Sequence, residues 1–424
     1  MSTQSSSITR RLSAAALLAA IVVSSSATGH ATPPGGVTIA VIGDTPYGAA
    51  TPGGPQAPDS TAFPNLARSI NADADVSLVV HLGDTKSGST SCGDAYLDLV
   101  KDWFNGTNGK GPGLVDPLVY TPGDNEWTDC HRANNGAFVP TSNGALPAGR
   151  LETLRSKYFA VPGQTIGAGA PRLIDTQATV PGYATFVENT KWIDGNVQFG
   201  VVHVVGSNNG VLPWFTQAGQ TPQTPAQLAA QTAELATRKA AALAWIDTIF
   251  DAAVADNRAG VMLGMQADMW DVFPGTALGQ FDDIVVKIAQ RSIAFGKPVL
   301  VMQGDSHTYK VDKPLDGSVA SASLGALHPY NPSANPTAYP PVANLTRIVV
   351  PGSNGASPNG LDTWLKLTVD PNTPQVFSHQ LLPVNTVPPV EIPEAPSVVL
   401  ISATMAAGLL LIVAMQRRRR LAPI

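Results

Sequence analysis

Charged residues, basic residues and cysteines are all scarce in this chain. Only 13% of its 424 residues are charged and 44% are hydrophobic, which excludes a wholly disordered chain and allows a substantial core. Six of the 26 basic residues lie near the two ends, so the long middle carries 20 basic against 31 acidic residues, a net charge of −11. Such an acidic domain argues against binding to a nucleic-acid backbone. No repeat recurs at the periods of solenoid proteins.

The first residues have the pattern of an export signal. Arg10 and Arg11 precede a short apolar run at 12–23, and small residues flank a cleavage point near 29–31. The pattern predicts a signal peptide at 1–31 and an exported protein. An uncleaved membrane anchor is the alternative, which the shortness of the apolar run disfavours.

The last residues have the pattern of a membrane anchor. Residues 397–415 are apolar and long enough to cross a bilayer, and four arginines follow in the tail at 416–424. The positive-inside rule places that tail in the cytoplasm and the main domain outside. The Pro-rich linker at 385–396 resembles a bacterial Pro-Glu-Pro sorting signal, which implies a sorting protease as a partner and removal of the helix. A buried core helix is the alternative.

Five short apolar runs each end in a turn that carries polar side chains. Short, β-branched runs separated by helical stretches are typical of buried strands in an α/β sheet, and ligands bind at the carboxyl ends of such strands. Carboxylates gathered along a single sheet edge would repel each other without a cation, so the pattern predicts a metal site. The polar residues at these ends are Asp44, Asp84, Asp124, Gln266, Asp305 and His307.

The only two cysteines lie shortly after two of these ends. Cys92 follows Asp84 by eight residues, and Cys130 follows Asp124 by six. In an exported protein such a pair can form a disulfide, which would tie the two loops together and hold both carboxylates in register. The sequence supplies no distance between them, so two unpaired buried thiols are the alternative.

The order of these ends, from about residue 37 to 310, resembles a divergent calcineurin-like metallophosphoesterase. The resemblance implies two metal ions that activate a water for attack on a phosphoester. It also implies that Asp44 is the first carboxylate ligand, Asp84 the bridging carboxylate and His307 the last imidazole ligand.

The departures from the family pattern exchange imidazoles for oxygen donors. Pro46 occupies a position where the family has a histidine, and Asp124 and Asn125 occupy two positions where the family has asparagine followed by histidine. Gln266 and Asp305 each replace a further histidine. A site rich in oxygen, with His307 as its only imidazole, favours Mn, Mg or Ca over Zn or Fe. A degenerate site that binds nothing is the alternative.

The function expected from this resemblance is an exported hydrolase of phosphate mono- or diesters. Tyr47, Lys86, Asn125 and His131 are candidates for contacting the phosphate, and His131 or Arg132 follows the third strand end closely enough to do so. Asn125 replaces the usual protonating histidine, and His131 is the candidate to take over that role. The alternative is a non-catalytic surface protein that keeps the fold and binds a metal or another ligand.

Helical periodicity predicts helices at 65–72, 92–104, 150–158, 224–256 and 281–294. Thr224 and Pro225 open the fourth of these with a capping box and a proline in the first turn. The stripe expected to pack this helix on the sheet comprises Leu228, Leu235, Leu243, Ile246 and Ile249.

The remaining strands are expected to complete a two-sheet α/β/β/α sandwich over residues 37–384, as the family implies. A hairpin is expected around Asp194 within 177–209, and the runs at 345–350, 364–369 and 376–381 are expected to form a second sheet. Residues 313–343 are expected to be a long surface loop. His81 and His203 are interpreted as buried structural histidines, and Asp268 and Asp271 as surface carboxylates, with a role as ligand or acid as the alternative.

Overall fold

A computed structural model describes residues 32–47, 62–136, 149–214, 223–271, 277–353 and 361–385. The expected signal peptide, transmembrane helix and tail, and all of the linker except Asn385, lie outside these ranges. Within them, no helix combines the length and the apolar character that crossing a membrane requires.

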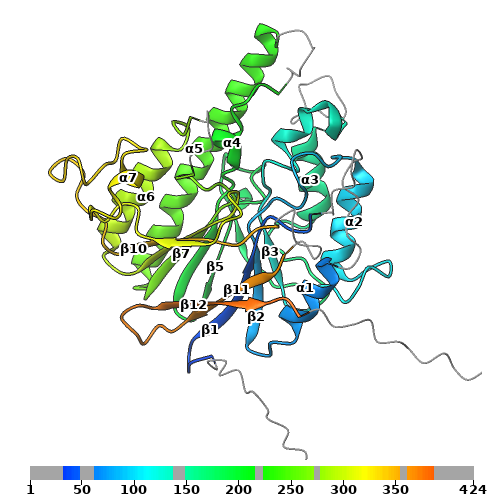
Figure 1. The fold of residues 1–424 in the computed structure, drawn as a ribbon, viewed down its shortest axis with the longest axis horizontal. Helices are drawn as coiled ribbons and strands as arrows, with labels where there is room; N and C mark the ends of the chain where they lie inside the picture. Colours follow the sequence, from blue (N-terminus) through cyan, green and yellow to red (C-terminus); the bar gives the residue numbers. More distant parts are fainter. Residues whose placement is uncertain are drawn as a thin grey trace, which may run out of the picture.

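Two mixed β-sheets with helices around them form the structure (Figure 1). The five-stranded sheet has the order β12 (Phe377–Pro383), β11 (Thr363–Val369), β1 (Val37–Ile42), β2 (Val76–His81) and β3 (Leu118–Tyr120). The seven-stranded sheet has the order β4 (Asp175–Thr176), β5 (Thr190–Asp194), β6 (Val197–Val201), β7 (Gly260–Gly264), β8 (Val299–Gln303), β10 (Leu345–Val349) and β9 (Lys310–Asp312). This mixed α/β architecture is consistent with the expected sandwich.

The side chains of β1 show how the layers are built. Ala40 and Ile42 pack in a cluster with the helices α1 (Ala62–Asn71), α2 (Asp94–Asn105) and α3 (Arg150–Tyr158). Ile39 and Val41, which point to the opposite face of the strand, pack against residues of β6, β7 and β8. The two sheets therefore face each other across an apolar layer, which explains why these strands are apolar on both faces.

A third apolar cluster joins the seven-stranded sheet to α5 (Pro225–Ala255) and α6 (Asp282–Phe295). Thr224 forms the predicted capping box at the start of α5. The predicted stripe is wrong at Leu228, which is 55% exposed, because the buried face of the helix begins at Gln231. The short helices are α4 (Gly206–Gly210), α7 (Ala322–Gly325), η1 (Thr128–His131), η2 (Ala133–Asn135) and η3 (Gln177–Thr179).

The prediction that the last three strands form one sheet is wrong. β10 pairs in parallel with β8, whereas β11 and β12 extend the other sheet beside β1. Alternating side chains identify a strand but carry no information about its partner, which explains the error.

Two related expectations also need correction. The five strand ends come from two sheets rather than from one edge, since β1, β2 and β3 lie in one sheet and β7 and β8 in the other. Residues 313–343 are more than a surface loop, because Leu315, Tyr330 and Val342 are buried in the core around α5 and α6.

Candidate metal centre

Three carboxylates converge where strands of both sheets end. One oxygen each of Asp84, Asp124 and Asp305 lies within 4.8 Å of the others, so this acidic cluster could hold a metal ion. Asp84 follows β2, Asp124 follows β3, and Asp305 follows β8. The predicted convergence of these ends is therefore present, although it spans two sheets.

The backbone at the strand ends turns through left-handed conformations. Asp44, Asp84, Asp305 and His307 all have positive φ, between 51° and 70°. Residues other than glycine rarely adopt this region, and such outliers persist only where the surroundings impose them. Gly123 allows the loop after β3 to approach Asp84 closely, because a Cβ at this position would lie 2.0 Å from Oδ1 of Asp84.

Asp44, which is fully buried, pairs beside the cluster with His307, whose side chain is 33% exposed. Nδ1 of His307 lies 2.7 Å from the carbonyl oxygen of Ser353, which can only accept, so Nδ1 carries a proton and Nε2 faces Asp44. The distance from Nε2 to Oδ1 of Asp44 is 3.3 Å. Burial lowers the pKa of His307, but the hydrogen bond and charge of Asp44 outweigh that effect and raise it. A ligating imidazole is held in the same way, by its second nitrogen.

Tyr47 and Asn125 both reach the cluster. Nδ2 of Asn125 donates to Oδ2 of Asp84 and to the Tyr47 hydroxyl, at 2.8 Å each. The Tyr47 hydroxyl is also 3.3 Å from Oδ2 of Asp84 and 3.3 Å from Nε2 of His307. These two predicted residues therefore lie beside the carboxylate of Asp84.

Gln266 lies beside the cluster with its amide orientation set. Its Oε1 accepts a hydrogen bond of 2.5 Å from the backbone N–H of Gly206, which can only donate. Nε2 consequently donates to Oδ1 of Asp124, at 3.1 Å. In this arrangement Gln266 orients the carboxylate of Asp124, while its own side-chain oxygen accepts a hydrogen bond from the Gly206 N–H.

Glu126 ties the two loops together, a role that the sequence analysis missed. Its buried carboxylate accepts from the backbone N–H groups of Asp84 (3.1 Å), Thr85 (3.1 Å) and Gly123 (2.8 Å). The Tyr120 hydroxyl donates to the same side chain at 2.7 Å. The only signal in the sequence was its place in the Gly-Asp-Asn-Glu turn.

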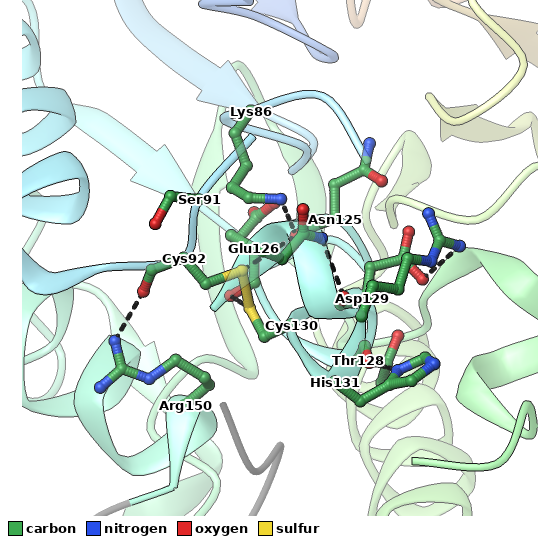
Figure 2. Close-up of a disulfide and its surroundings, with 12 residues drawn as sticks. Lys86, Ser91, Cys92, Asn125, Glu126, Thr128, Asp129, Cys130, His131 and Arg150 are labelled. Carbon is green, nitrogen blue, oxygen red and sulfur yellow. Dashed lines mark hydrogen bonds and ion pairs between the residues drawn. A yellow bond between two sulfur atoms is a disulfide. The ribbon is translucent and has the colours of Figure 1, made fainter. Parts of the chain in front are cut away.

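Lys86 and His131 are not brought to the cluster. The Lys86 ammonium is buried and donates to the carbonyl oxygens of Ser87 (2.8 Å) and Asn125 (2.5 Å), as Figure 2 shows in part. Burial lowers its pKa to about 8. His131 lies in η1 with Nδ1 2.5 Å from the carbonyl oxygen of Thr128.

Cys92 and Cys130 form the predicted disulfide (Figure 2). Their Cα atoms are 5.6 Å apart, and both residues are fully buried. The bond joins the loop after Asp84 to η1, which follows Asp124. The alternative of two free thiols is therefore wrong.

The two histidines interpreted as structural are both fully buried. Nε2 of His81 is 2.6 Å from the Thr45 carbonyl oxygen, and Nδ1 of His203 is 3.0 Å from Oε1 of Glu188. Asp268, expected at the surface, is instead buried. It forms an ion pair of 2.6 Å with Arg347 and accepts a hydrogen bond from Ser306, which explains its burial.

A bound cation would relieve the electrostatic repulsion within the cluster. Burial, followed by the charges of neighbouring carboxylates, raises the pKa of Asp84 and of Asp305 well above the ordinary value. In the ranges described above, no lysine or arginine forms an ion pair with Asp84, Asp124 or Asp305. A divalent cation would supply the missing charge, and carboxylate oxygens suit hard ions such as Mg²⁺, Mn²⁺ and Ca²⁺.

No family model matches the sequence, and a search of curated proteins finds no significant match.

Proposed function

We propose that this protein is an exported, metal-dependent phosphoesterase that hydrolyses phosphate mono- or diesters. The observation that carries the proposal is the convergence of Asp84, Asp124 and Asp305, with one oxygen of each within 4.8 Å of the others. Such a set of oxygen donors suits a divalent cation that acts on a phosphoester. The disulfide supports export, because such bonds persist in oxidising compartments.

The cation-holding residues in this proposal are Asp44, Asp84, Asp124, Asp305 and His307. A bound divalent cation supplies Lewis-acid activation of water and neutralises charge that develops on the phosphate. Gln266 orients one carboxylate of the set, and Glu126 fixes the backbone on which another is carried.

Tyr47 and Asn125 are the residues proposed to meet the phosphate. Burial and the charge of Asp84 raise the pKa of Tyr47 well above its ordinary value, so its hydroxyl keeps its proton and acts as a hydrogen-bond donor. Asn125 has no proton to release. A substrate with a good leaving group is therefore expected, because neither side chain can protonate a poor one.

The test is Mn²⁺-dependent hydrolysis of an aryl phosphate and an aryl diester by the parent, Asp84→Ala and Asp175→Asn. Asp175 is a matched control, since its side chain is 68% exposed and pairs only with Lys191 among the described residues. Activity should be lost in Asp84→Ala and kept in the control. Equal activity in all three proteins would place the reaction elsewhere.

One observation favours a second candidate, a surface protein that binds a metal without catalysis. Among the described residues, no histidine other than His307 contacts the carboxylates, so a proton donor of the usual type is missing. Thermal unfolding with and without Mn²⁺ separates the two candidates when it is paired with the hydrolysis assay. Stabilisation without turnover of any ester would favour binding.

A further inference from the structure

Four residues (202–205) separate the end of β6 from a left-handed turn of the chain, the segment α4. Ser207, Asn208 and Asn209 have φ of 53°, 53° and 58°, with ψ between 35° and 53°. A run of three such residues is unusual, because a left-handed helical turn brings Cβ too close to the following carbonyl oxygen. The turn must therefore be imposed by its contacts.

On one side, the turn contacts the carboxylate cluster. The Ser207 hydroxyl donates to Oδ2 of Asp124 at 2.6 Å. The other oxygen of Asp124 accepts from Gln266, whose amide is oriented by the Gly206 N–H. Both of these hydrogen bonds to Asp124 therefore depend on where the turn lies. Gly206 also packs against Asp305, because a Cβ there would lie 2.5 Å from Oδ1 of that residue.

On the other side, the turn is held by α5. The buried guanidinium of Arg238 donates to both the backbone carbonyl and the side-chain oxygen of Asn209, the former at 2.9 Å. Gln231, two helical turns earlier on the same face, donates to the carbonyl oxygen of Gly210 at 3.2 Å. Arg238 also lies over the ring of Trp127, 4.7 Å from its centroid, and Trp127 directly follows Glu126.

We propose that the turn Gly206–Gly210 is part of the metal centre, with Ser207 and Arg238 as its positioning residues. Ser207 orients Asp124 directly, and Arg238 keeps the turn in its left-handed conformation. The inference rests on the proposed function only in that the cluster binds a divalent cation. It adds a residue on α5, Arg238, that affects the site although α5 carries none of the carboxylates of the cluster.

The expected effect follows from the way outer hydrogen bonds act on a metal site. Partners that orient ligating side chains typically change metal affinity by about 10- to 100-fold when they are removed. We therefore expect Ser207→Ala and Arg238→Met to weaken Mn²⁺ binding by about 10-fold or more. Arg238→Lys keeps a donor for Asn209 but loses the two-pronged contact, so its affinity should fall between those of Arg238→Met and the parent.

The experiment is calorimetric titration of the full-length parent and variants with Mn²⁺, with thermal unfolding of each metal-free protein alongside. Lys239→Met is the matched control, because Lys239 neighbours Arg238 on α5 but pairs with Asp283. It should bind Mn²⁺ like the parent. If Arg238→Met does not fold, Ser207→Ala decides, because it leaves the contacts of Arg238 intact.

The outcomes are distinct. Weaker binding in Ser207→Ala, with metal-free unfolding near that of the parent, supports the positioning role. Parent-like Mn²⁺ affinity in Ser207→Ala overturns it while leaving the metal centre intact. No Mn²⁺ binding by the parent overturns the metal centre itself, and this inference with it.

Discussion

Removal of the disulfide should destabilise the protein strongly and change its metal affinity little. The bond closes a loop across a sequence separation of 38 residues. Loop-closure entropy for that length is about 13 cal/mol/K, or about 4 kcal/mol at 25 °C, gained through restriction of the unfolded chain. The double variant Cys92→Ala/Cys130→Ala should lose about that much free energy of unfolding.

Metal affinity should be kept because Glu126 also joins the loop after Asp84 to the loop that carries Asp124. The carboxylate of Glu126 accepts four hydrogen bonds, from Asp84, Thr85, Gly123 and Tyr120. These contacts act in the folded state, where they keep Asp84 close to the loop that carries Asp124. The disulfide acts mainly on the unfolded state, so its loss need not move the ligands.

The assay is urea unfolding monitored by tryptophan fluorescence, together with Mn²⁺ titration of the folded protein. The parent treated with a phosphine reductant under denaturing conditions and then refolded is the control, and it should match the double variant. A stability loss below about 1 kcal/mol would refute the entropic argument. A collapse of Mn²⁺ affinity with folding intact would show that the disulfide, not Glu126, holds the loops.

Three further predictions concern single side chains. Gln266→Glu should weaken Mn²⁺ binding, because a carboxylate would replace the amide that donates to Asp124; unchanged or tighter binding in a titration would contradict this orienting role. Glu126→Gln should lower the free energy of urea unfolding by about 1–3 kcal/mol, because its amide would leave the Thr85 N–H without an acceptor. An unchanged free energy of unfolding would show that the hydrogen bonds accepted by Glu126 do not stabilise the fold. Burial lowers the pKa of His81 to about 4, so the unfolded state, with a pKa near 6.5, binds the proton first and stability falls as pH drops between these values. Protonation of this one group should lower the free energy of unfolding by up to about 3 kcal/mol over that pH range, and His81→Gln should lack this part of the pH dependence. If the free energy of unfolding falls equally steeply with pH in both proteins, His81 is not buried in its neutral form.

Much of the site could be predicted because it lies at strand ends. Apolar runs mark the strands, and a turn after each run marks where a polar side chain emerges, so the convergence of Asp84, Asp124 and Asp305 was accessible from the sequence. The disulfide was accessible too, since both cysteines follow strand ends that were expected to be neighbours. Local rules also predicted the capping box of Thr224.

The rest depends on contacts between distant segments. Nothing in the run at 345–350 shows that it pairs with β8 rather than with β11, because the partner is chosen by packing across the whole fold. The left-handed turn at Ser207 carries a local hint in its Asn-Asn-Gly sequence, but its conformation is imposed by Arg238, which lies 29 residues after Asn209. Lys86 was predicted to face substrate, yet backbone carbonyl groups hold its ammonium inside.

In the proposed function, carboxylates from two sheets together hold a divalent cation. The most direct measurement is an anomalous difference map from crystals of the protein grown with Mn²⁺. We expect a peak among the carboxylates of Asp84, Asp124 and Asp305. A map with no peak there, at an Mn²⁺ concentration that saturates other manganese proteins, would contradict it.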